Sequence, residues 1–161
     1  MNVRELMTPD PEACVPGDTL AVAGELMRRR HCGFAPVVDG RTTNRVVGVL
    51  TDRDLALHLT RTDGRPSQVT VEACMTKDPT VIAPDADLTE AAQAMERLAV
   101  HRLPVVEHGR LVGVLSLKDI ALAARKQWAS SGPHVAERQL TDIIEAIAAA
   151  QAAREPISPH A

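Results

Sequence analysis

The feature that most constrains the fold of this chain is an internal repeat. Residues 7–38 align with residues 75–106 at a constant offset of 68. Three extra residues in a turn of the first copy then reduce the offset to 65. At that offset GVLTDRD, Gly48 to Asp54, matches GVLSLKD, Gly113 to Asp119. A repeat of this length predicts two similar supersecondary units that bury their apolar faces against each other.

The two copies, about residues 2–60 and 70–126, are each predicted to have the order β-α-β-β-α. Alternating β-branched runs bounded by Pro and Gly indicate strands, and apolar positions at helical spacing indicate helices. The expected strands are 12–16, 34–39 and 45–50 in the first copy and 80–84, 102–107 and 110–115 in the second. The expected helices are 18–30, 50–59, 86–99 and 116–128. MTPDP and MTKDP, which lead into the copies, are expected to be extended or turned because they contain Pro.

The fold class is therefore predicted to be α/β, or more strictly α+β, with the two repeats packed sheet to sheet in one globule. We expect residues 1–65 to form the first repeat, 66–127 the second, and 128–161 a C-terminal extension. In that extension, SSGPH at 130–134 is a linker or a helix start. Residues 135–155 predict an amphipathic helix whose apolar face needs a surface. That surface is the repeat pair, a second copy of the chain, or another protein.

Composition excludes several classes of protein. Aromatic residues make up 1% of the 161 residues and the net charge is −3, so a nucleic-acid partner is not expected. No apolar run approaches the ~20 residues of a membrane helix, and MNVRELMTPD has no signal-peptide core. The three cysteines form no CxxC, so we expect them to be small buried side chains in a reduced, cytoplasmic protein.

The repeated motif TDRD or SLKD has two interpretations. A hydroxyl residue followed three positions later by an acid is close to a helix capping box, although such boxes favour Glu or Gln over Asp. The alternative is a ligand grip, in which the carboxylate accepts hydrogen bonds from vicinal ribose hydroxyls and the helix N-terminus faces a phosphate. The two interpretations are compatible, because a cap in the empty protein can give way to a ligand.

With these repeats and motifs, residues 2–126 resemble a CBS-domain pair, also called a Bateman module. In particular they resemble the stand-alone bacterial proteins that contain little beyond two CBS domains. The resemblance implies a pseudo-two-fold pair that forms a homodimer through its helices. It also implies a regulatory sensor of AMP, ADP or ATP, with S-adenosylmethionine or NAD(H) as further candidate ligands and no cofactor required.

The resemblance also implies the ligand-binding residues. Asp54 and Asp119 hold ribose, and Thr51 and Ser116 touch ribose or phosphate. Each cleft draws on both repeats. One cleft combines Ser116 and Asp119 with Thr8, Ala13, Cys32, Gly33 and Phe34. The other combines Thr51 and Asp54 with Thr76, Val81, Val100, His101 and Arg102. Arg53 and Lys118, just before the two acids, are positioned in the sequence to reach phosphate.

The two copies differ in charge around the motif. VHRLPVV resembles the family's phosphate-contacting segment and carries His101 and Arg102, whereas the first copy has Gly33 and Phe34 there. Arg102 is a fork donor for phosphate in this interpretation, and a solvated strand-start residue in the other. It could serve either cleft. Asp52 adds negative charge beside Thr51, which argues against a triphosphate at the first motif.

The sequence also bears on two other functions. Catalysis is not expected, since no HExxH, CxxC or GxSxG motif accompanies the histidines and cysteines, and no metal site is expected either. The second is a ligand-free interaction scaffold, in which the motifs act only as caps and residues 135–155 bind a protein partner.

Overall fold

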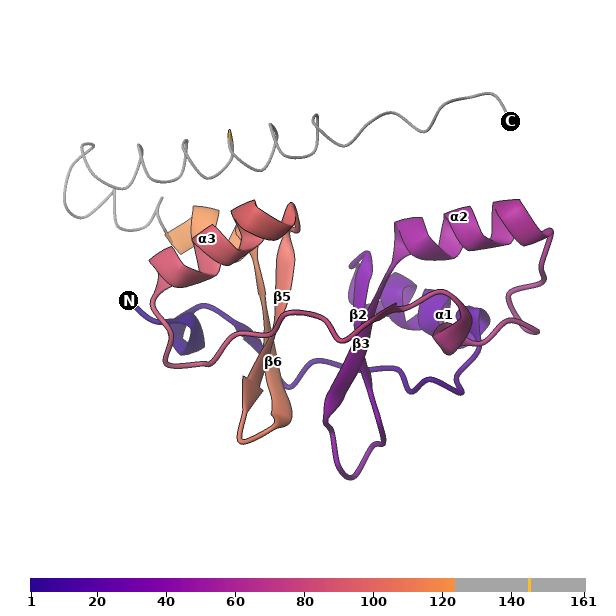
Figure 1. The fold of residues 1–161 in the computed structure, drawn as a ribbon, viewed down its shortest axis with the longest axis horizontal. Helices are drawn as coiled ribbons and strands as arrows, with labels where there is room; N and C mark the ends of the chain where they lie inside the picture. Colours follow the sequence, from indigo (N-terminus) through magenta and orange to yellow (C-terminus); the bar gives the residue numbers. More distant parts are fainter. Residues whose placement is uncertain (124–144, 146–161) are drawn as a thin grey trace. The chain divides into compact units, whose positions relative to one another are not determined.

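The computed structural model describes residues 1–123 and 145 of the chain (Figure 1). The helix predicted at 135–155 lies outside the described residues, apart from Glu145, which is helical and exposed. The linker predicted at 130–134 and the end of the helix predicted at 116–128 also lie outside them. Within the described part, no helix is both long enough and apolar enough to cross a membrane.

The helices predicted at 18–30, 50–59 and 86–99 are confirmed, as is the described part of the helix predicted at 116–128. The first repeat contains α1 (Leu20–Arg30) and α2 (Asp52–Thr62), and the second contains α3 (Leu88–Leu98). Residues 117–123, after the second hairpin, are also helical. The apolar stripes of α1 and α3 are buried, whereas α2 has no buried residue and lies at the surface.

Backbone geometry repeats along with the sequence. The residues after α1 and α3, His31 and Ala99, both have left-handed conformations with φ of 50° and 52°. Asp10 and Asp78, also 68 positions apart, have φ of 46° and 48°. A non-glycine residue with positive φ is uncommon, so these matched pairs indicate that the two copies follow the same path in detail.

Each repeat contributes one antiparallel hairpin to a three-stranded sheet. In the first repeat β2 (Phe34–Val38) pairs with β3 (Val46–Thr51), and Phe34 lies opposite Thr51. In the second repeat β5 (Arg102–Glu107) neighbours β6 (Arg110–Ser116). All five residues of β2 are buried, whereas burial alternates along β6, as expected for a sheet with one covered face.

The third strand of each sheet comes from the segment that leads into the other repeat. Thr76–Lys77 (β4) pairs with β3, and Thr8–Pro9 (β1) neighbours β6. Short 3-10 helices precede these strands: η1 (Val3–Glu5) and η2 (Val71–Ala73). The leading segment of each repeat is therefore exchanged onto its partner repeat, which repeat alignment alone does not predict.

Matched hydrogen bonds hold the exchanged segments in place. Val3 N–H donates to Ala86 O at 3.0 Å, and its counterpart Val71 N–H donates to Asp18 O at 2.8 Å. Both valines are fully buried. The exchange therefore satisfies backbone groups and buries one apolar anchor from each leading segment.

The strands predicted at 12–16 and 80–84 are wrong. In the first segment only Cys14 pairs, in a parallel bridge with Val37, and in the second only Ile82 forms a bridge. Prolines flank both segments at 11 and 16 and at 79 and 84. Because Pro has no N–H and disrupts a ladder, pairing does not extend beyond one residue.

The described chain divides into two compact units. The first-repeat unit contains Pro9–Val81 and the hairpin tip Pro104–Gly113, and the second-repeat unit contains Met1–Thr8, Ile82–Leu103 and the residues from Val114 onward. The core of the first-repeat unit is aliphatic, as the composition predicts. It is built from Cys14, Leu20, Ala23, Leu26, Met27, Ala35, Val37, Leu50 and Val71.

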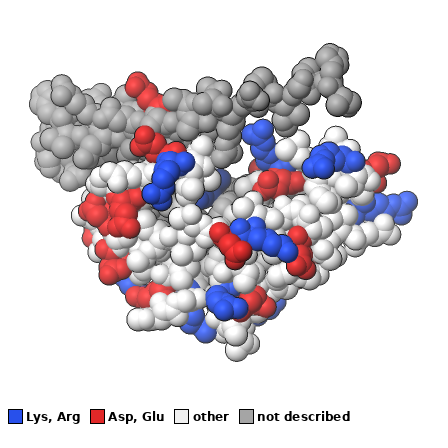
Figure 2. Space-filling model, viewed as in Figure 1, with Lys and Arg blue, Asp and Glu red and all other residues white. Residues whose placement is uncertain are grey.

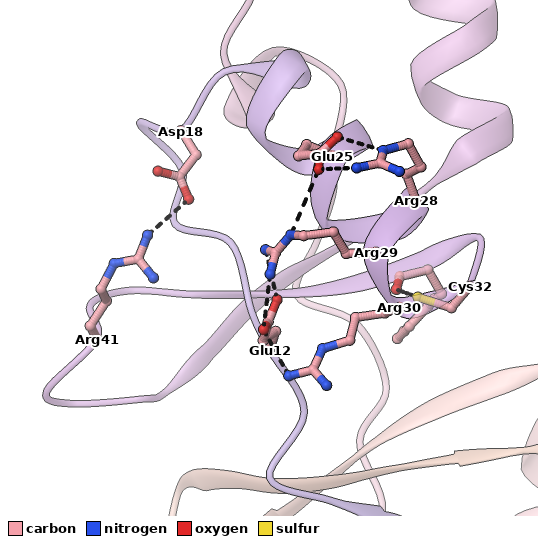
Figure 3. A network of polar contacts seen from close by, with 9 residues as sticks. Glu12, Asp18, Glu25, Arg28, Arg29, Arg30, Cys32 and Arg41 are labelled. Atoms are coloured by element: carbon pink, nitrogen blue, oxygen red, sulfur yellow. Dashed lines mark hydrogen bonds and ion pairs between the residues drawn. The ribbon is translucent and has the colours of Figure 1, made fainter.

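Several charged side chains at the surface form ion pairs. On the face drawn in Figure 2, acidic and basic side chains are interspersed over the described residues. Figure 3 shows how Glu12 accepts hydrogen bonds from Arg29 at 3.0 Å and from Arg30 at 2.7 Å, at the end of α1. These arginines hold the pKa of Glu12 below its usual value, with the Arg30 hydrogen bond as the largest cause.

Glu12→Gln is expected to remove a small, pH-dependent stabilisation. A carboxyl group whose folded-state pKa is lowered stabilises the fold above its unfolded pKa, and the contribution is lost as pH falls through the folded pKa. The variant should unfold at lower urea than wild type at about pH 7, and the difference should shrink as the pH falls below the usual Glu range. A urea-midpoint difference that does not shrink under acidic conditions would contradict this assignment.

Candidate functional site

The first repeat ends in a closed set of hydrogen bonds that we call the first grip, Thr51 to Asp54. Thr51 is the last residue of β3, and Asp54 lies in the first turn of α2. One carboxylate oxygen, Asp54 Oδ2, accepts from Thr51 N at 3.0 Å and from Thr51 Oγ1 at 2.6 Å. Asp54 N in turn donates to Thr51 Oγ1 at 3.1 Å.

The second repeat builds the same arrangement, the second grip, from Ser116 to Asp119. Asp119 Oδ2 accepts from Ser116 N at 2.9 Å and from Ser116 Oγ at 2.6 Å. Asp119 N donates to Ser116 Oγ at 3.3 Å. The shared spacing in the sequence therefore produces shared geometry, and the capping interpretation of both motifs is confirmed.

The caps leave part of each acid available. In both grips the cap uses Oδ2 alone, and among the described residues no hydrogen bond to Oδ1 of Asp54 or Asp119 is found. Both aspartates are half-buried at the start of a helix, where the backbone favours negative charge. Each grip thus holds a carboxylate whose second oxygen can accept a hydrogen bond from a sugar hydroxyl.

The exchanged strands bring one more predicted residue to each grip. Thr76 in β4 pairs with Val49, two residues before Thr51. Thr8 in β1 lies in the sheet whose strand β6 ends at Ser116. Both threonines are exposed, so each sheet places an available hydroxyl residue on the strand beside its grip strand.

The other predicted residues are divided between the units. The first-repeat unit holds the first grip with Arg53, Thr76, Val81, Ala13, Cys32, Gly33 and Phe34. The second-repeat unit holds the second grip with Lys118, Thr8, Val100, His101 and Arg102. Each predicted cleft draws on both units, and its assembly stays a prediction. Arg53, Lys118, Val81 and His101 are exposed, whereas Phe34 is 8% exposed and packs as a core residue.

A contact that the sequence did not reveal joins Asp52 to Gly33. Asp52 N–H donates to Gly33 O at 3.3 Å, and the Asp52 carboxylate lies over the Gly33 backbone. A Cβ at position 33 would lie 2.7 Å from Asp52 Cγ, which real side chains do not tolerate. The presence of glycine was the available signal, since glycine permits close approach of a neighbouring group.

Gly33→Ala is expected to lower the free energy of unfolding by about 1 kcal/mol, at the low end of overpacking because the Asp52 side chain can rotate. Adding Asp52→Ala should recover most of that loss, as a double-mutant cycle on urea unfolding would show. Gly17→Ala is the matched control, because no atom lies within 4 Å of the added Cβ. Additive effects of the two substitutions at 33 and 52 would refute the contact.

Close packing also explains why the first motif contains a glycine. A Cβ at Gly48 would lie 3.0 Å from the backbone oxygen of Thr76 and 2.7 Å from Met75 Sδ. Gly48 pairs with Lys77 of β4. The glycine of GVLTDRD therefore allows the exchanged strand to approach the grip strand.

Cys14 and Cys74 are poorly suited to nucleophilic chemistry. Burial raises the pKa of Cys74, and the negative charge of Asp54 raises it further. Burial likewise raises the pKa of Cys14 to about 11. Thiolate is the reactive form, so both thiols are held in the unreactive state. Among the described residues, no group of three or more His, Cys, Asp or Glu side chains is arranged to hold a metal ion.

Two repeats of this fold, each ending in the same hydroxyl–Asp grip, define a tandem-repeat α+β protein. Comparison with known sequences identifies it: the CBS domain family matches residues 3–61 and 71–126. The chain belongs to the CBS-domain family and carries two copies of the domain.

Relatives contain the module both alone and within enzymes. The chain is 34% identical over 121 residues to the CBS domain-containing protein YhcV of Bacillus subtilis, covering 75% of this chain and 84% of YhcV. It is 29% identical to inosine-5′-monophosphate dehydrogenase of Staphylococcus epidermidis, covering 78% of this chain but only 25% of that enzyme. Similarity to the dehydrogenase therefore does not extend over most of that enzyme.

A solved structure supplies a ligand-bound relative. The crystal structure of CBSX2 of Arabidopsis thaliana in complex with AMP matches with a TM-score of 0.67 and 28% identity. The match covers 78% of this chain and 97% of CBSX2. The fold found here is thus shared with a protein that binds an adenine nucleotide.

Proposed function

We propose that this protein is a regulatory module, not an enzyme, that binds an adenine nucleotide, with AMP, ADP or ATP as its ligand. The observation that carries the proposal is the matched pair of grips, each with one carboxylate oxygen used by the cap and the other available. Such a carboxylate can accept hydrogen bonds from the vicinal hydroxyl groups of a ribose. The AMP complex of CBSX2 supports this choice of ligand class. S-adenosylmethionine and NAD(H) contain the same adenosine and remain candidates.

The mechanism follows from differential affinity. A ligand that binds one arrangement of the repeats more tightly shifts the population toward it. We propose that the chain acts as a cytoplasmic homodimer, with residues 1–65 and 66–127 as its two domains and 128–161 as an extension that carries the signal to a protein partner. The unpaired cysteines among the described residues are consistent with a reducing compartment.

Thermal unfolding in the presence of candidate ligands tests the proposal. A ligand that binds only the folded chain stabilises it by about 2.7 kcal/mol at a concentration 100 times its Kd, so the melting temperature should rise with ligand concentration. The control ligand is GMP, which differs from AMP in its base. The ligands to compare with it are AMP, ADP, ATP, S-adenosylmethionine and NADH. No shift with any adenosine ligand at millimolar concentration would overturn the proposal.

A further inference from the structure

The two grips share geometry but not charge, and the difference lies at one residue. Position 52 of the first grip is Asp, and the equivalent position 117 of the second is Leu. Both residues follow the hydroxyl residue directly and make the same backbone bond: Asp52 N–H to Gly33 O at 3.3 Å and Leu117 N–H to His101 O at 2.9 Å. The backbone hydrogen bond is therefore the same in both repeats, whereas only the first repeat has a carboxylate at this position.

In the first grip every amide at the start of α2 is occupied from within the chain. Thr51 N–H donates to Asp54 Oδ2, Asp52 N–H to Gly33 O, and Asp54 N–H to Thr51 Oγ1. Arg53 N–H donates to Asp52 Oδ1 at 2.8 Å. The Asp52 carboxylate thus occupies the amide and the positive helix end that a phosphate would use.

The second grip leaves this position open. Its amides at Ser116, Leu117 and Asp119 are bonded as in the first grip, but no partner for the Lys118 amide is found among the described residues. Lys118 also carries a positive, exposed side chain. Arg53 supplies a similar exposed cation to the first grip. The position after the hydroxyl residue is therefore neutral in the second grip and acidic in the first.

We propose that Asp52 is a specificity-determining residue: it makes the first grip favour adenosine ligands without a 5′-phosphate, while the second grip takes the phosphorylated ligand. The inference rests on the proposed function. A phosphate at the first grip would have to displace the Asp52 carboxylate from Arg53 N–H and then lie beside it, and like charges at close range repel. An uncharged 5′ group meets no such repulsion, and a cationic one is attracted.

The test compares adenosine with AMP, which share base and ribose and differ only in the phosphate. Binding to full-length chains is measured by calorimetry, with Asp119→Ala isolating the first grip and Asp54→Ala isolating the second. Where an alanine variant does not fold, the asparagine variant replaces it. The quantity compared is the ratio of the Kd for adenosine to the Kd for AMP.

In the Asp119→Ala background, AMP should bind no more tightly than adenosine. Adding Asp52→Asn should raise the ratio on the order of tenfold, the scale of one close charge–charge contact at a surface site. Asn keeps a side-chain oxygen that can accept from Arg53 N–H. In the Asp54→Ala background AMP should bind more tightly than adenosine, and Leu117→Asp should reduce that preference by a similar factor.

The outcomes separate the inference from the proposed function. If wild type binds none of the adenosine ligands, that is adenosine, AMP, ADP, ATP, S-adenosylmethionine and NADH, the proposed function fails. If wild type binds but Asp52→Asn leaves the ratio within about twofold, far below the tenfold scale of a charge contact, the inference fails alone. It also fails if the Asp119→Ala chain prefers AMP or binds no adenosine.

Discussion

Asp119→Ala is expected to weaken AMP binding by about 100-fold, because two hydrogen bonds between a charged carboxylate and ribose hydroxyls are lost, each of the order of 1.5–3 kcal/mol. The carboxylate is fixed by two bonds to Ser116, at 2.9 and 2.6 Å, which keep its other oxygen in place for the ligand. Calorimetric titration of wild type and variant with AMP measures the effect.

The control must separate loss of a cap from loss of a ligand contact. Asp87 caps α3 by accepting from Thr89 N–H at 2.8 Å, and it belongs to neither grip. Asp87→Ala should therefore cost about 1 kcal/mol of stability, as cap removal does, and leave AMP affinity unchanged. If both alanine variants weaken binding equally, or if Asp119→Ala does not weaken it, the carboxylate is not a ribose ligand.

Leu50→Ala is expected to produce the largest loss of stability, about 2–5 kcal/mol, as for other buried leucines replaced by alanine. Leu50 is 0% exposed and belongs to the core of the first-repeat unit. It also directly precedes Thr51. Removing its side chain leaves a cavity that the surrounding aliphatic residues fill only in part.

Urea unfolding of Leu50→Ala and a matched surface variant measures this effect. Leu57 in α2 is 44% exposed, and Leu57→Ala should change the free energy of unfolding by about 0.5 kcal/mol or less, as usual for surface substitutions. The midpoint should fall for Leu50→Ala with the slope unchanged, since the slope reports the surface exposed on unfolding. A loss of less than about 1 kcal/mol, below the Leu-to-Ala range, would contradict the assignment of Leu50 to the core.

The parts of the fold that the sequence predicted are those set by local pattern. The hairpins and helices follow from periodicity and from Pro and Gly between them. The grips were predicted for a similar reason, because the hydroxyl and the acid are three residues apart. At this spacing the two side chains meet wherever a helix begins at the hydroxyl residue.

The parts that were missed depend on contacts distant in the sequence. The strands expected at 12–16 and 80–84 have the right composition, but prolines at both ends limit pairing to a single residue. Exchange of the leading segments is equally non-local, since Val3 and Val71 are buried on the partner repeat. The Asp52 contact spans 19 positions to Gly33, and the sequence predicted only the charge of Asp52, not where it lies.

Calorimetric titration of the nucleotide-free, full-length chain with AMP tests the central claim most directly. We predict saturable binding that AMP and adenosine compete for and that GMP does not reproduce. Heats no larger than those of dilution, for AMP and for every other adenosine ligand at millimolar concentration, would show that the two grips are helix caps and nothing more.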